Sequence, residues 1–266
     1  MFSLVLNSTW ENYKSNIKVA VSYLLLLVFI FVFTYFGEFF FNSGTVFLNL
    51  RFSTFTIVGL ILGLIFLYAY SFFVSLTIYA IKRDLHTTSF DDYWEKIFKG
   101  AAVNVFVSNF IITLVSLAFF LIATYFTLPI IYPILFSFIL TLTLMYVPQV
   151  IVLEELDVFS AFGVALNFFL EKIWLSILIT IFASVILFII ILLEQLLYGF
   201  FLANFVSLIL ILVFLIPFIE EAKAFAYMMR FDLIKNPAIH HSKVRHKVKA
   251  KIDAFRLRQK NPRGKL

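Results

Sequence analysis

The chain has 266 residues, of which 63% are hydrophobic, 20% aromatic and only 14% charged. Soluble domains are about 45–50% apolar and about 25% charged, so this composition excludes a soluble enzyme, a disordered chain and a fibrous repeat. The chain contains no cysteine, which removes disulfides and thiolate chemistry. Lipid is therefore the expected surrounding of most of the chain.

The first residues do not have the form of a cleaved secretory signal. Such a signal needs a basic start, a short apolar stretch and a small-residue cleavage site. Residues 1–18 are instead mixed, with Trp10, Glu11, Lys14 and Lys18 ahead of the first apolar run. We expect the first span to be retained.

Uncharged stretches mark the membrane crossings. Because a helix rises 1.5 Å per residue and the hydrocarbon core is about 30 Å thick, roughly 20 apolar residues make one crossing. Six transmembrane helices are predicted, at about residues 19–38, 54–81, 101–126, 131–153, 173–193 and 202–222.

The third and fourth of these spans share one run of 54 uncharged residues between Lys99 and Glu154. A single helix of that length would be about 80 Å long, more than twice the membrane. Pro129 and Pro133 disfavour helix at their positions. The run is therefore predicted to fold back in a tight hairpin from Thr127 to Pro133.

The distribution of basic residues predicts the orientation. Cytoplasmic loops retain an excess of Lys and Arg, and of the 21 basic residues only Arg51 falls in a loop on the opposite side. Both termini are therefore expected in the cytoplasm, in a multi-pass protein of the cell membrane.

The three tryptophans indicate an internal repeat. Trp10, Trp94 and Trp174 each lie just before or at the start of an odd-numbered span. A Glu-Lys-Ile sequence adjoins both Trp94 and Trp174. Tryptophan also prefers membrane interfaces wherever they occur, which explains the depth but not the spacing. We predict an all-α polytopic membrane protein in which residues 1–232 form three parallel two-helix repeats, each led by a short cytoplasmic amphipathic helix.

Polar residues fall on one face of the second span. Tyr68, Ser71, Ser75 and Tyr79 recur at offsets of three and four, so they share a helix face. This polar stripe, with Asn104 and Ser108 of the third span, either lines a polar path or hydrogen-bonds neighbouring helices; the second interpretation is favoured because such bonds are common in bundles.

On the opposite face of the second span, Gly59 and Gly63 are one turn apart, a spacing that lets helices approach closely.

Acidic residues near the sixth span are the next candidates. Glu220, Glu221 and Lys223 follow Pro217, and Glu220 with Lys223 has the i,i+3 spacing of a local ion pair. A carboxylate in hydrocarbon is a functional hypothesis. Counting about 20 residues inward from residue 202 places this group near the cytoplasmic interface, which favours a structural pair over a proton relay.

No catalytic, metal or cofactor motif is present. The chain lacks His-Glu-x-x-His, Gly-x-Ser-x-Gly and the Gly-x-x-x-x-Gly-Lys phosphate loop. It also lacks the Pro-x-acid-x-x-base signature of mitochondrial carriers. Glu220-Glu221 comes near the motif of intramembrane prenyl-protein proteases, but position 225 is Phe. We therefore expect a protein that is not an enzyme and binds no cofactor.

The last residues form a basic tail, predicted at 233–266. Between Arg230 and Leu266 there are 12 basic and two acidic residues. Val244, Val248, Ile252 and Phe255 recur at helical spacing, which predicts a basic amphipathic helix. Its cations are expected to contact anionic lipid headgroups: Lys243, Arg245, Lys247, Lys249, Lys251, Arg256 and Arg258. Nucleic acid is a less favoured partner, and the tail could also serve only as the positive-inside signal.

One segment carries a family resemblance. It reads Val147-Pro148-Gln149-Val150-Ile151-Val152-Leu153-Glu154-Glu155-Leu156-Asp157-Val158-Phe159-Ser160-Ala161-Phe162-Gly163-Val164-Ala165-Leu166 and leads to Lys172-Ile173-Trp174. This segment resembles prokaryotic six-span proteins related to the membrane domain of glycerophosphodiester phosphodiesterases. In that family a span ends in Pro and an apolar run, and an acidic pair, an Ala-rich helix and a Trp follow. The resemblance implies a membrane module without the hydrolase, since no His-Arg-Gly is present.

Two functions remain open from the sequence. The first is a non-catalytic scaffold or accessory subunit of a membrane complex, with a further membrane protein as partner. The second is a transporter or lipid-handling protein that uses a polar path between the helices. A scaffold predicts polar groups paired within the protein, whereas a transporter predicts a water-accessible cavity at mid-depth.

Overall fold

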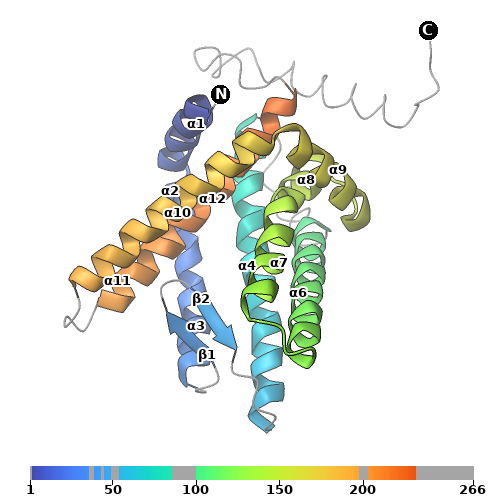
Figure 1. Ribbon diagram of the computed structural model, residues 1–266. Coiled ribbons are helices and arrows are strands. Elements are labelled where there is room, and N and C mark those ends of the chain that lie inside the picture. The colour runs from blue at the N-terminus through green and yellow to red at the C-terminus, as the bar shows by residue number, and fades with distance from the viewer. Residues whose placement is uncertain are drawn as a thin grey trace.

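The computed structural model describes residues 2–35, 39–42, 45–48, 54–85, 100–197 and 203–231. Apart from short turns, these residues are helical except for one short antiparallel sheet, in which β1 (Phe39–Asn42) pairs with β2 (Thr45–Leu48). The predicted all-α polytopic class is confirmed (Figure 1). The small sheet is an addition that the sequence analysis did not predict.

Five described helices are long and apolar enough to cross a membrane. They cover Gly59–Lys82, Ala102–Tyr125, Ile131–Glu154, Ile173–Leu196 and Phe205–Met228. A sixth crossing is counted when Phe2–Ser15 and Ile17–Phe31, whose axes meet at 73°, are taken as one bent span. The chain is therefore a multi-pass membrane protein.

The first pair of helices follows a bent N-terminal helix. Helix α1 (Phe2–Ser15) ends at Asn16, and the chain continues through α2 (Ile17–Ser22), the 3-10 turn η1 (Tyr23–Leu25) and α3 (Leu26–Tyr35). The return helix is α4 (Thr54–Leu85). α1 buries Val5, Thr9 and Tyr13, which share one face because they are four residues apart.

The second pair is a hairpin of α6 (Ala102–Tyr125) with α7 (Ile131–Thr143) and α8 (Val147–Glu154). α6 begins and ends within one residue of its predicted span, and so do α7 and α8 taken together. After α6, Leu128 N–H donates to Ala123 O at 2.8 Å and Thr127 N–H to Thr124 O at 3.1 Å. This is a Schellman motif, in which Thr127 has a φ of 51°.

The third pair follows a short amphipathic helix. This helix is α9 (Val158–Glu171), and α10 (Ile173–Leu196) comes directly after it. The return runs through α11 (Ala203–Ile209), the π-helical segment η3 (Leu210–Leu215), α12 (Ile216–Met228) and the 3-10 turn η4 (Met229–Phe231). Helix α12 ends six residues past the predicted end at residue 222.

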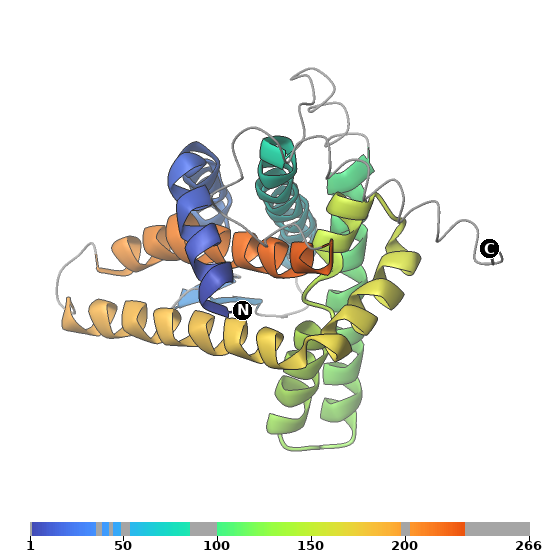
Figure 2. The ribbon, with the colours of Figure 1, turned by 90° about the horizontal axis from the view of Figure 1, so that it is seen from above.

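Figure 1 shows α4, α6 and α7 roughly upright, whereas α10 and the α11–α12 return cross them at a slant. Figure 2 shows the same two slanted helices lying across the view from above. α12 packs against α1, α4 and α8, so the last span lies among the others and is the most buried of the five, while α6 is the least buried. The core is centred where α8, α9 and α12 meet, around Tyr146, Phe168 and Tyr227.

The order of elements agrees with the predicted repeat in two places. The short helix α1 precedes the first pair, and the short helix α9 precedes the third. Trp10 is 45% exposed on α1, and Trp174 is 77% exposed at the start of α10. Trp94 and the segment predicted to lead the second pair lie outside the described residues.

Candidate functional site

Acidic and basic side chains gather where α4, α8 and α12 lie together. We call this group the inner ionic cluster, and it contains Lys82, Glu154, Glu155, Glu220, Glu221, Lys223 and Arg230. Its members come from distant parts of the sequence. Packing of α12 against α4 and α8 brings them together.

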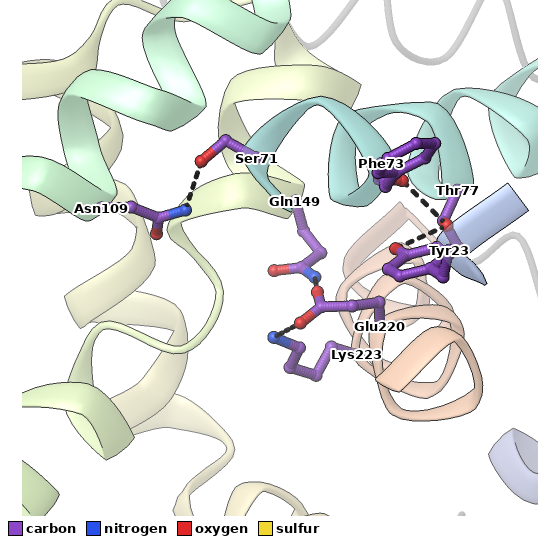
Figure 3. A network of polar contacts seen from close by, with 8 residues as sticks. All are labelled: Tyr23, Ser71, Phe73, Thr77, Asn109, Gln149, Glu220 and Lys223. Atoms are coloured by element: carbon purple, nitrogen blue, oxygen red, sulfur yellow. Dashed lines mark hydrogen bonds and ion pairs between the residues drawn. The ribbon is translucent and has the colours of Figure 1, made fainter. Parts of the chain in front are cut away.

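Glu220 lies at the centre of this cluster. Lys223 Nζ donates to Glu220 Oε1 at 2.6 Å, and Gln149 Nε2 donates to Glu220 Oε2 at 2.9 Å (Figure 3). The side chains of Glu220 and Lys223 are only 8% and 11% exposed. A buried charge is tolerated when it is paired and hydrogen-bonded, and Glu220 meets both conditions. The predicted pair of Glu220 and Lys223 is present.

Gln149 joins α8 to this pair and is fully buried. Its Nε2 reaches Glu220, while its Oε1 makes no hydrogen bond with a described residue. The glutamine therefore contributes one donor to the carboxylate from a second helix. Gln149 was not among the predicted site residues, because a single amide in an apolar run gives no periodic signal.

A second group forms around Glu154, the last residue of α8. Tyr227 Oη donates to Glu154 Oε1, and Arg230 Nη1 lies 3.4 Å from the same oxygen and 3.1 Å from Tyr227 Oη. Glu155 has a φ of 56° and ends the helix in the left-handed region. Because the backbone changes direction at Glu155, the carboxylates of Glu154 and Glu155 bind different partners.

Lys82 binds the end of α8 from α4. Its Nζ donates to Val152 O at 2.8 Å and to Glu155 Oε1 at 2.9 Å. A cation at the carboxyl end of a helix satisfies free carbonyls and interacts favourably with the helix dipole. The contact therefore joins α4 to α8.

The N-terminal helix α1 contacts the same region through α12. Asn12 Nδ2 donates to Glu221 Oε2 at 2.9 Å, and Tyr13 Oη donates to Val213 O at 3.0 Å. Pro217 has no N–H, so in a regular helix it would leave the carbonyl of Val213 without its usual donor. Tyr13 supplies that donor from outside the helix, beside the π-helical segment η3.

The polar stripe of α4 is mostly internal. Ser71 and Ser75 are fully buried, and their hydroxyls donate to the backbone carbonyls of Leu67 and Ser71. Tyr79 is buried, with Lys82 Nζ 5.3 Å from its ring centre. Tyr68 is 36% exposed and contacts the ring of Phe106 edge-on.

The cross-helix bond of this stripe comes from a residue that was not predicted. Asn109 Nδ2 donates to Ser71 Oγ at 2.9 Å (Figure 3). Ser108 is buried but donates to Val105 O on its own helix, and Asn104 is partly exposed. The residue of α6 that bonds to α4 is therefore Asn109, one position after the predicted Ser108.

Two further buried bonds link helices, and neither was predicted. Tyr23 Oη and Thr77 Oγ1 are 3.0 Å apart between η1 and α4. Ser176 Oγ donates to Tyr146 Oη at 3.1 Å between α10 and the residue before α8. The sequence alone does not indicate which hydroxyls meet, because this depends on how two helices are rotated about their axes.

The glycine pair of α4 does not form the expected close approach at Gly63. A Cβ built there would meet no heavy atom within 4 Å among the described residues. Gly59 is buried. Small residues favour packing only where a neighbouring helix reaches them, and none of the described helices does so at Gly63. The predicted lipid-binding residues of the tail lie outside the described residues.

Among the residues that the structure describes, no group of three or more His, Cys, Asp or Glu could hold a metal ion. The four carboxylates of the inner ionic cluster each accept a hydrogen bond or an ion pair from a protein side chain. The arrangement therefore joins helices through charge.

No family model matches the chain, and neither a curated protein nor a solved structure matches it.

Proposed function

We propose that the chain is a non-catalytic integral membrane protein that acts as a scaffold or accessory subunit of a complex in the cell membrane. The observation that carries this proposal is the pairing of polar side chains across the described helices. Bonds between Ser71 and Asn109, Tyr23 and Thr77, and Gln149 and Glu220 link separate spans. Such bonds stabilise one arrangement of the bundle.

A transport path would use these groups differently. A substrate that passes through must exchange hydrogen bonds with the lining side chains, as water-filled cavities in transporters permit. Ser71 and Ser75 instead donate to backbone carbonyls of their own helix. This pattern supports a structural role for the stripe, and a transporter or lipid-handling protein that uses a polar path is the competing proposal.

The proposed partners are lipid and a second membrane protein. The basic tail supports contact with anionic headgroups, because each Lys or Arg near the surface contributes about 1 kcal/mol. Both termini are proposed to lie in the cytoplasm, where the tail would face the anionic lipids of the cytoplasmic leaflet. The tail would then hold the scaffold at the membrane surface beside its partner.

A set of variants separates the two proposals. Ser71→Ala with Ser75→Ala removes the stripe hydroxyls, and Glu220→Gln with Lys223→Met removes the central charges together. Replacing a buried ion pair by uncharged residues is often neutral, whereas removing one partner destabilises by about 3–5 kcal/mol. Lys223→Met alone is therefore the control for loss of folding.

The measurements are the growth phenotype of cells that lack the chain and carry each variant, the folded amount, and the proteins and lipids that copurify in mild detergent. A scaffold predicts that both double variants restore growth whenever they fold, and that deletion of residues 233–266 weakens copurification. Loss of growth with an unchanged folded amount in either double variant would contradict the scaffold and support transport.

A further inference from the structure

An apolar groove lies on the outer side of the second helix pair, away from the inner ionic cluster. It has a volume of about 280 Å³ and is bounded by α6, α7 and α9. No lining side chain is polar: the lining consists of Ile111, Ile112, Val115, Leu140, Leu144, Phe162, Gly163 and Leu166.

Two residues of the lining have distinctive local features. Leu144 follows the last turn of α7 and leaves helical geometry, with φ of −101° and ψ of 13°. On the facing helix, Gly163 has no side chain, and a Cβ built there would meet no heavy atom within 4 Å. Gly163 therefore leaves its side of the groove unfilled.

The position of the groove relates it to the bilayer. Ile111, Ile112 and Val115 lie near the middle of α6, whereas Gly163 and Leu166 belong to the short amphipathic helix α9. A helix of this kind lies at the membrane interface. The groove thus runs from headgroup level toward the centre of the hydrocarbon, as the acyl chain of a lipid does.

The groove is also continuous with the lipid-facing surface of the bundle. Val115 lines it and is 42% exposed, beside Leu114 on α6. In a multi-pass membrane protein, acyl chains cover such a surface.

A transmembrane helix of a partner is a poorer occupant. Helices associate in membranes through stretches of small residues and through polar side chains that hydrogen-bond across the contact. The lining has one glycine and no polar side chain. A flexible hydrocarbon chain needs neither feature.

We propose that this groove binds one acyl chain of a bilayer phospholipid, whose headgroup lies at the level of α9. Phe159 at the start of α9 and Trp174 at the start of α10 are 78% and 77% exposed. Aromatic side chains of this kind are enriched at the headgroup level. The site does not depend on the proposed scaffold role, because none of its residues belongs to the cross-helix polar network.

The test uses the full chain in phosphatidylcholine vesicles that contain a small fraction of phosphatidylcholine with a photoactivatable diazirine on one acyl chain. After illumination, labelled peptides are located by mass spectrometry. We expect labelling to concentrate on peptides that contain Ile111 to Val115 and Leu140 to Leu144. Even labelling over all lipid-facing helices would overturn the proposal.

Gly163→Leu is the matching variant, because its side chain enters the open space of the groove. We expect it to lower groove labelling by about tenfold, since overfilling an apolar site displaces its occupant. Gly63→Leu is the control: a Cβ at Gly63 also meets nothing within 4 Å, and Gly63 does not line the groove. Equal labelling in the two variants would contradict the proposal.

Two additional arms identify the occupant. Unlabelled phosphatidylcholine is already in excess in these vesicles, so free fatty acid added to them should lower groove labelling no more than it lowers labelling of the other lipid-facing peptides. Stronger competition by the fatty acid would overturn the assignment to a phospholipid. A fall in groove labelling relative to the other peptides as the protein-to-lipid ratio rises would overturn it in favour of a second copy. Labelling of the unaltered protein decides the proposal even if Gly163→Leu does not fold.

Discussion

Glu220 illustrates how one carboxylate is accommodated among apolar helices. It receives a proton donor from Lys223 on its own helix and another from Gln149 on α8. The first partner is one turn away, so the sequence could predict it. The second depends on the packing of α8 against α12, which no local pattern records.

The bond between Ser71 and Asn109 also depends on how two helices pack, and its energy can be measured. A double-mutant cycle of Ser71→Ala and Asn109→Ala should give a coupling energy of about 0.6 kcal/mol, the average for cross-helix bonds in membranes. The measurement is reversible unfolding in mixed micelles.

Asn104→Ala is the matched control, because Asn104 lies on the same helix and is partly exposed like Asn109, whereas the bond to Ser71 comes from Asn109. Its cycle with Ser71→Ala should give no coupling. A larger coupling to Asn104 than to Asn109 would show that α4 and α6 are rotated differently from the arrangement described.

Asp157 provides a pH-dependent contribution outside the membrane-spanning segments. It caps α9, and the hydrogen bonds from the Ser160 hydroxyl and backbone N–H lower the pKa of Asp157. Because the folded pKa is below the unfolded one, the cap stabilises fully above about pH 4 and loses this effect as pH falls through the folded pKa.

We therefore expect the difference in thermal midpoint between the natural protein and Asp157→Ala to be largest near neutral pH and to shrink in acid. Asp157→Asn should remain close to the natural protein at neutral pH, since Asn also caps helices without titrating. A difference that stays constant down to pH 3 would contradict a role for the charge.

At the scale of elements, charge gaps and prolines located most helix ends. α6 and the α7–α8 pair match their predicted spans within one residue, because lipid sets the length of a crossing and Pro129 marks the reversal. The π-helical segment η3 was not predicted. Tyr13 of α1 donates to the carbonyl of Val213 within it, a contact between residues 200 positions apart that no local pattern indicates.

The turn between α6 and α7 carries a residue in an unfavourable conformation. Thr127 has a φ of 51°, which a β-branched residue rarely adopts. Thr127→Gly should stabilise the protein by about 1 kcal/mol, because glycine enters this region without the steric cost. Unfolding in mixed micelles measures the change.

Thr113→Gly serves as the comparison for this variant, since Thr113 lies in the interior of α6. Glycine in a helix interior is destabilising by about 0.5–1 kcal/mol relative to alanine. Opposite signs at the two positions are expected. Destabilisation by Thr127→Gly would mean that the threonine side chain contributes more than its backbone costs.

At the scale of the whole molecule, the sequence predicted the helical class and the order of the elements. It did not predict that α10 and α12 cross the other helices at a slant (Figures 1 and 2). Apolar periodicity is weak in helices surrounded by lipid, since their outer faces are as hydrophobic as their cores. The tilt follows instead from contacts of α12 with α1, α4 and α8.

The absence of cysteine makes the predicted orientation directly measurable. Leu128→Cys lies in the hairpin after α6, and Phe159→Cys lies at the start of α9; both positions are exposed. In intact cells a membrane-impermeant maleimide should label only Leu128→Cys, and permeabilised cells should show labelling of both. The reverse pattern would place the termini outside.

The contact of Tyr13 with Val213 spans 200 residues. Because ribosomes release the amino end first, helix α1 is complete long before the carbonyl it binds has been synthesised. The newborn chain therefore makes this contact of α1 only after the last described crossing has been synthesised. A chain interrupted before that point would carry an unattached first helix, which distinguishes incomplete products from finished ones.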